Sequence, residues 1–174
     1  MMELEHRFRD AIRENNQRIY GVCSYFFDDR SDRDDAYQES LIRIWQNLRS
    51  FRGNSLLSTW IYRVVVNTCL MHIRNDKRRK DLIGNGLTTE TGMVADHPAD
   101  DDPGHQDRKI AFIHQFISTL VTADKTLVSL YLEDFTTREM AEITGMSEVN
   151  VRVRLHRIRE KIKNEWEEQQ DGTG

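Results

Sequence analysis

The last third of the sequence contains basic side chains at a spacing suited to contact with DNA bases. Residues 147–163 hold six basic and two acidic side chains, a local charge of +4 on about five helical turns. Apolar residues recur there at spacings of four, three and four, which predicts one inward-packing stripe: Val151, Leu155, Ile158 and Ile162. The outward surface then carries Arg152, Val153, His156 and Arg157. Because arginine pairs best with guanine in the major groove, this face is a candidate surface for reading bases.

Local signals upstream of this helix predict the pair of helices that would position it. Thr136 and Glu139 form a T-x-x-E capping box that opens a short helix. Gly145 ends that helix in a left-handed turn, and Ser147 can cap the longer helix that follows. Small Ala141 lies where the two helices would touch. The segment therefore predicts a helix-turn-helix.

Two alternatives stay open for this segment, an unrelated helical hairpin and a basic face that is merely solvated. Arg154 also departs from the pattern, since a simple repressor-type motif often has an aliphatic residue there. We expect Leu155 to take over that packing role. His156 has no partner whose spacing would favour a metal site.

A second candidate surface lies on the predicted helix around residues 35–49. Its apolar side is formed by Tyr37, Leu41, Ile44 and Leu48. Its other side would carry Asp35, Gln38, Glu39, Ile42 and Gln46. Charged residues around an apolar anchor suit a protein interface, but an isolated exposed isoleucine is also ordinary. Interface and solvated surface remain equal alternatives on this feature alone.

A third candidate surface follows the turn at Phe51–Ser55. A helix capped by Ser55 or Ser58 would place four polar or aromatic side chains within an arc of about 60°: Trp60, Arg63, Asn67 and Arg74. Aromatic stacking and an amide can together hold an unpaired base, and Phe51 with Asn67 could supply them. The competing interpretation makes Trp60 a core residue and Asn67 a satisfied helix amide.

Catalytic and metal sites find little support in the sequence. The carboxylates between Asp28 and Asp35 fall in a short loop and a helix N-terminus, where the helix dipole favours them. No phosphate-binding glycine loop, HExxH motif or nucleophile elbow is present. Cys23 and Cys69 lie in apolar helical patterns, which predicts buried thiols. We expect no enzyme activity, no metal and no cofactor.

Charge and composition divide the 174 residues into two parts joined by a linker. Residues 1–80 hold 15 basic and 11 acidic side chains, residues 81–108 hold one and seven, and residues 109–174 hold nine and eleven. The middle segment also contains both prolines and four of the nine glycines, which is typical of a flexible linker. We therefore predict an all-α protein with two small helical domains, 1–80 and 109–174. No apolar run could cross a membrane and no secretory signal opens the chain, so we expect a soluble cytoplasmic protein.

Three sequence pieces resemble the extracytoplasmic function sigma factors of the sigma-70 family. They are QESLIRIW (Gln38 to Trp45), FRGNS followed by TWIYR (Thr59 to Arg63) with Asn67, and MSEVNVRVRLHRIR (Met146 to Arg159). The resemblance identifies residues 1–80 as region 2, which binds core polymerase and the minus-ten element, and residues 109–174 as region 4, which binds the minus-thirty-five element. It covers nearly the whole chain outside the linker.

The resemblance also implies partners and residue roles. The partners would be core RNA polymerase, through its beta-prime clamp helices and beta flap, promoter DNA, and an anti-sigma factor. Clamp-helix contacts would come from Asp35, Gln38, Glu39, Ile42 and Gln46. Minus-ten contacts would come from Phe51, Arg52, Asn54, Ser55, Trp60, Arg63, Asn67 and Arg74. Minus-thirty-five contacts would come from Asn150, Arg152, Val153, His156 and Arg157.

Two departures from the family pattern occur, and one other class of protein remains possible. Leu120-Val121-Thr122 replaces a usual Leu-Pro-Pro, and Val149 and Val153 replace small residues of the recognition helix. The second change leaves the promoter sequence open. The alternative is a helix-turn-helix regulator that is not a polymerase subunit. It would explain only the C-terminal third of the chain.

Overall fold

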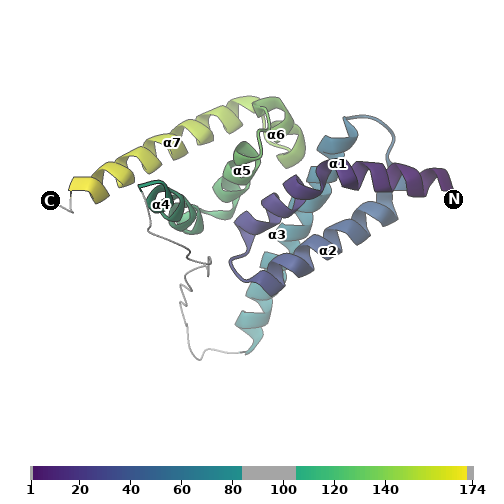
Figure 1. The fold of residues 1–174 in the computed structure, drawn as a ribbon, viewed down its shortest axis with the longest axis horizontal. Coiled ribbons are helices and arrows are strands. Elements are labelled where there is room, and N and C mark those ends of the chain that lie inside the picture. Colours follow the sequence, from purple (N-terminus) through teal and green to yellow (C-terminus); the bar gives the residue numbers. More distant parts are fainter. Residues whose placement is uncertain (1, 84–104, 172–174) are drawn as a thin grey trace. The chain divides into compact units, whose positions relative to one another are not determined.

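The computed structural model describes residues 2–83 and 105–171, and these residues form helices and no strand (Figure 1). The chain divides into two compact units, Met1–His97 and Pro98–Gly174. The first unit contains α1 (Met2–Phe26), α2 (Arg30–Asn47), the 3-10 turn η1 (Leu48–Ser50) and α3 (Leu57–Ile83). The second unit contains α4 (His105–Thr119), α5 (Thr122–Leu132), α6 (Thr137–Thr144) and α7 (Glu148–Asp171). The prediction of an all-α fold in two helical domains is confirmed.

In the first unit α1, α2 and α3 pack against one another around one apolar core. The fully buried side chains include Ile19, Val22, Ile44, Ile61, Tyr62 and Val65. Cys23 and Cys69 face each other across α1 and α3 as free, buried thiols, with their sulfur atoms 3.8 Å apart. The hydrogen bond from Cys69 to Cys23, together with burial, raises the pKa of the Cys69 thiol. The prediction of buried thiols is confirmed.

Aspartates at the start of α2 cap this helix and tie it to α1. The Asp29 carboxylate accepts hydrogen bonds from the backbone N–H groups of Ser31 and Asp32, at 2.7 and 3.2 Å. Asp34 accepts a hydrogen bond from the hydroxyl of Tyr20 at 3.2 Å, which ties α2 to α1. These contacts satisfy helix N-terminal groups and complement the dipole. Their geometry gives these carboxylates a structural role.

The second unit contains the predicted helix-turn-helix. Thr136 and Glu139 make both hydrogen bonds of the capping box at the start of α6. Gly145 ends α6 at φ 76° and donates its N–H to the carbonyl of Ala141 at 2.9 Å. The Ser147 hydroxyl then accepts the N–H of Asn150 at 3.2 Å, three residues into the next helical segment. The short turn is therefore set by local hydrogen bonds and one positive φ angle.

Arg154, the departure from the repressor pattern, forms an ion pair that joins α7 to α5. Its guanidinium donates to the Asp124 carboxylate at 2.7 Å, and both side chains are largely shielded from solvent. Leu155 beside it is buried, as expected for the residue that takes over the packing role. A polar cross-link therefore replaces an aliphatic contact at this point of the motif.

Helix boundaries differ from the predictions at three places. Helix α3 begins at Leu57, so Ser58 lies inside its first turn, and the Ser55 hydroxyl donates to the carbonyl of Leu56. Neither serine is the residue that immediately precedes the helix, as a cap would be. Helices α3 and α4 also extend into both ends of the predicted linker, to Ile83 and from His105. The linker prediction for residues 84–104 lies outside the described residues.

None of the helices within residues 2–83 and 105–171 is both long enough and apolar enough to span a membrane.

We expect Gly145→Ala to lower the local unfolding free energy of α6 and α7 by about 1–2 kcal/mol, the cost of a left-handed conformation for a residue with a Cβ. Beyond Gly145 and its two chain neighbours, no atom lies within 4 Å of the added Cβ, so the expected cost comes from the local backbone conformation. Amide hydrogen exchange of the two helices measures the change. Gly145→Asn is the matched control and should lose less, since asparagine tolerates this conformation. Equal stability of the alanine variant and the wild type would contradict the backbone argument.

Candidate nucleic-acid interface

The inward stripe of α7 fixes which of its side chains can meet a ligand. Val151, Leu155 and Ile158 are buried, and Ile162 is half-buried. Helix α7 packs with these residues toward α5 and α6. The stripe predicted from periodicity is confirmed, and the opposite surface of α7 faces solvent.

All five residues assigned to the upstream-reading surface are exposed, as the helical period requires: Asn150, Arg152, Val153, His156 and Arg157. The Arg152 guanidinium donates to Glu148 at 3.1 Å, one turn earlier on α7. Exposed ion pairs of this kind contribute well under 1 kcal/mol to stability, so the guanidinium can leave Glu148 at little cost and bind a phosphate or a base. Val149 lies on the same surface and is 68% exposed, whereas Val153 is 42% exposed. The sequence interpretation noted Val149 only as a departure, although the same period places it outward.

The candidate single-strand surface on α3 lies opposite the core of the first unit. Arg63, Asn67 and Arg74 are exposed, and Arg52 and Asn54 are exposed in the preceding loop. Ser55 is half-buried there, and Gly53 takes φ 75°. The helical arc predicted for these side chains is consistent with their exposure, while their role stays a prediction.

The two aromatic residues of this surface pack against each other with their rings tilted by 50°. Phe51 and Trp60 are both half-buried, with ring centroids 5.5 Å apart. The Arg7 guanidinium of α1 lies 5.4 Å from the centroid of the Phe51 ring. Phe51 is therefore covered in part by its neighbours. Trp60 is partly buried, as a core residue would be, and partly accessible, as a residue that contacts a base would be. An incoming base would meet the rim of an aromatic pair rather than a bare Phe51 ring.

The outward face of α2 has the mixed character that the sequence indicated. Asp35, Gln38, Ile42 and Gln46 are exposed, and Ile42 is 49% exposed. Glu39 is half-exposed and accepts a hydrogen bond from Arg43 at 2.7 Å.

An apolar extension of this face was missed in the sequence. Trp45 is exposed on α2 and packs edge-on against Phe8 of α1, with ring centroids 5.2 Å apart. These two rings and Ile12 help to line an open hollow of about 440 Å³. The pairing joins residues far apart in sequence, so periodicity within one helix gave no signal for it.

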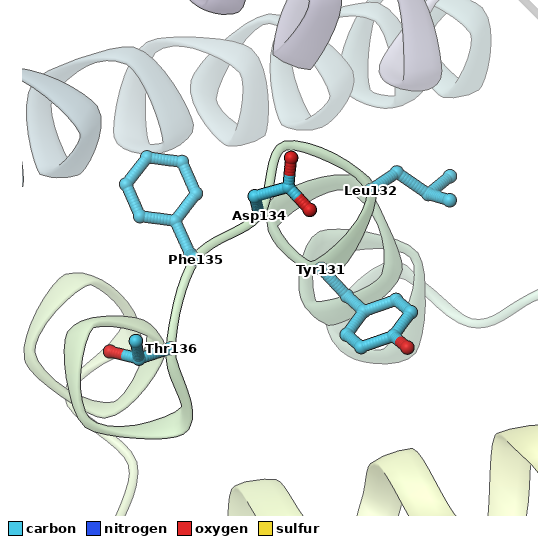
Figure 2. A pocket seen from close by; sticks show the side chains of 5 residues that line it. All are labelled: Tyr131, Leu132, Asp134, Phe135 and Thr136. Carbon is cyan, nitrogen blue, oxygen red and sulfur yellow. The ribbon is translucent and has the colours of Figure 1, made fainter.

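A second hollow lies at the turn between α5 and α6 (Figure 2). It measures about 320 Å³ and is lined by Tyr131, Leu132, Asp134, Phe135 and Thr136. The Arg159 guanidinium of α7 lies 4.9 Å from the centroid of the Tyr131 ring. Asp134 is the one carboxylate among the residues that line this hollow. Within the described ranges, no cluster of three or more His, Cys, Asp or Glu side chains could hold a metal ion.

Two family descriptions match the chain, one in each unit. Sigma-70 region 2 matches residues 11–79, and Sigma-70, region 4 matches residues 113–162. The first match includes α2 and most of α3, and the second includes the helix-turn-helix. The two matches therefore contain all three candidate surfaces.

Two solved structures share the fold, and one of them is the sigma factor RpoE. RpoE from Bartonella quintana, in a co-crystal with the anti-sigma factor NepR, gives a TM-score of 0.73 at 18% identity, over 91% of this chain and 95% of that chain. CnrH, in complex with the cytosolic domain of CnrY, gives 0.66 at 16% identity, over 94% of this chain and 89% of that chain. These likenesses show a shared fold.

Curated relatives extend over most of both chains. The ECF RNA polymerase sigma-E factor of Haemophilus influenzae is 32% identical over 168 residues, which span 90% of this chain and 86% of that protein. The ECF RNA polymerase sigma factor SigW of Bacillus subtilis is 29% identical over 164 residues, which span 91% of this chain and 88% of that protein. The chain therefore belongs to the extracytoplasmic function (ECF) sigma factors of the sigma-70 family.

Proposed function

We propose that the two units of this sigma factor divide promoter recognition, with α7 reading the upstream element and α3 the unpaired downstream element. A sigma factor binds core RNA polymerase and directs promoter recognition, DNA opening and initiation. The observation that carries the division is that each unit exposes a polar and basic face opposite its own buried core. Residues 1–80 would act as region 2 and residues 109–174 as region 4.

The upstream element would be read by the exposed face of α7 in the major groove. A helix-turn-helix places the N-terminal part of its second helix against base edges. Arg152 and Arg157 can each pair with a guanine, and His156 and Asn150 add hydrogen-bonding groups beside them. The local charge of +4 over residues 147–163 favours approach to phosphates despite a net charge of −4 for the chain.

The downstream element would be held on α3 after the duplex opens. The rim of the Phe51–Trp60 pair offers a stacking wall, and Asn67 offers an amide donor and acceptor on the same exposed side. Arg52, Arg63 and Arg74 would neutralise the backbone of the captured strand, while Asn54 and Ser55 supply polar groups in the loop.

Core polymerase would dock on the outward face of α2, with the beta-prime clamp helices as its partner. Ile42 supplies an apolar anchor, and Asp35, Gln38, Glu39 and Gln46 supply a polar surround. The beta flap would contact the second unit. The structures of RpoE with NepR and of CnrH with CnrY support an anti-sigma factor as a further partner. The protein would act in the bacterial cytoplasm, at the nucleoid when bound to polymerase, and would contribute no catalytic group of its own.

We expect Glu39→Lys to reduce association with core polymerase by tenfold or more, because charge reversal at an interface costs several kcal/mol. Reconstitution with core enzyme, followed by transcription from a supercoiled promoter library, measures both binding and function. The melting temperature should stay unchanged, since the Glu39–Arg43 pair is partly exposed and weak. Glu14→Lys on the exposed side of α1 is the matched charge control. Normal assembly of the Glu39 variant would remove this face from the interface.

Arg152→Ala and Arg157→Ala should each weaken binding of the holoenzyme to the upstream element by about 1–3 kcal/mol if the arginine reads a base. Each variant should also relax sequence preference at one position. Competition binding with single-base variants of a selected promoter measures both effects. Lys163→Ala, farther along α7 and exposed, is the control. An equal loss on every sequence would mean phosphate contact, and wild-type affinity in both variants would refute the assignment.

Asn67→Ala should abolish discrimination of base changes at one minus-ten position on pre-melted templates, because the amide that reads the base edge is gone. Opening and transcription on duplex promoters should fall, and the melting temperature should stay the same. Asn75→Ala, at another exposed asparagine of α3, should keep base discrimination. Early melting, or full discrimination in the Asn67 variant, would show that Asn67 is structural.

A further inference from the structure

Helix α7 exposes two valines, Val149 and Val153. The base contacts proposed above for arginine, histidine and asparagine side chains give no reason for an exposed valine at either position. We propose that Val149 and Val153 form an apolar reader of thymine 5-methyl groups in the upstream promoter element. The proposal rests on the proposed role of α7 as the helix that enters the major groove. It adds thymine, recognised by its methyl group, to the bases that this helix would select.

The helical period puts both valines at the centre of the exposed face. At 100° per residue, Val149 and Val153 lie about 160° and about 200° around the helix from the buried Val151. Their exposed fractions of 68% and 42% agree with that position. The two side chains therefore point away from the core of their unit.

Polar and basic side chains flank the valine pair on both sides. On the same angular scale Arg152 and His156 lie on one side, at about 100° and about 140°. Asn150 and Arg157 lie on the other side, at about 260° and about 240°. A helix that enters a groove with this face meets the base edges first with its valines. The flanking cations favour a nucleic acid over an apolar protein surface as the partner.

Valine is a costly choice at these positions unless it contacts something. As a β-branched residue it favours the helix less than alanine, lysine or glutamate, and its exposed methyl groups gain nothing from the fold. The same branching fixes χ1, so each valine presents its methyl groups in one orientation and loses little freedom on binding. Rigid methyl groups suit a small apolar target.

Thymine supplies that target in the major groove. Its 5-methyl group is the one apolar feature that the edges of unmodified base pairs present there, and apolar side chains are its usual contacts. Val149 and Val153 are one helical turn apart, about 6 Å along the axis. Successive base pairs are about 3.4 Å apart, so the two valines can reach thymines that lie up to about two base-pair steps apart. The valines would thus add thymine preference beside positions read by the arginines.

The test replaces each thymine of the upstream element, one at a time, by deoxyuridine, which lacks only the 5-methyl group. Holoenzyme containing the full chain is first used to select promoters from a random library. Competition binding is then measured on the substituted duplexes. We expect one or two positions where deoxyuridine weakens binding about fourfold, the factor that corresponds to one buried methyl group.

The matched variants tie that loss to the valines. Val149→Ala and Val153→Ala should each abolish the deoxyuridine effect at one position, and neither should lower the melting temperature, since both side chains are exposed. Val121→Ala, at a valine of the same unit that is 64% exposed but lies outside α7, should leave every deoxyuridine effect in place.

Two results would overturn the proposal. One is a selected upstream element without thymine on either strand, and the other is a set of deoxyuridine effects that both valine variants retain. Failure of the proposed function looks different, because the Arg152 and Arg157 variants would then both bind the upstream element with wild-type affinity. Binding of a protein partner by the valines would appear as wild-type deoxyuridine effects in both variants, and so also counts against methyl reading.

Discussion

The burial of one stripe of α7 is the constraint on which the DNA-facing surface depends. Val151, Leu155 and Ile158 lie in the core of the second unit, so the helix has one stable rotation about its axis. A different rotation would expose these side chains, at about 1.5–3 kcal/mol for each one. The exposed face is therefore set by packing, and its residues can vary without moving the helix. This separation lets Val149 and Val153 occupy the exposed face of α7 without any change in the buried stripe.

In the first unit, burial of one side of a helix likewise determines which side is exposed, for both α2 and α3. Helix α2 buries Ala36, Ser40 and Ile44 and exposes its opposite side, the proposed docking face, while α3 exposes Arg63, Asn67 and Arg74, part of the proposed single-strand face. Aromatic contacts join α1 to α2 and to the loop that precedes α3, since Phe8 meets Trp45 and the Arg7 guanidinium lies over Phe51. Adjacent residues of α1 thus support two different surfaces. A change in the first turns of α1 would disturb the docking face and the single-strand face together.

Features set by local chemistry could be predicted from the sequence, and features set by tertiary contact could not. The helix-turn-helix is specified within a few residues by the capping box, the positive φ of Gly145 and the Ser147 cap. The exposed faces of α2, α3 and α7 follow from helical period alone. By contrast, the Arg154–Asp124 ion pair spans 30 residues, and no spacing rule links its partners. The contact between the Phe51 and Trp60 rings also depends on the path of a loop, which the sequence indicated only as a turn.

The distribution of charge explains why apolar and base-specific contacts matter so much in this chain. Non-specific affinity for DNA grows with the number of phosphates neutralised, and a net charge of −4 limits that term. Residues 81–108 hold seven acidic side chains and one basic side chain, so this part of the sequence adds no attraction to phosphates. A protein of this charge gains little from DNA of arbitrary sequence. In the proposed function, selectivity then comes from contacts that depend on the base and from the polymerase that holds the chain at the promoter, and both kinds of contact are assigned to faces that the buried helix stripes leave exposed.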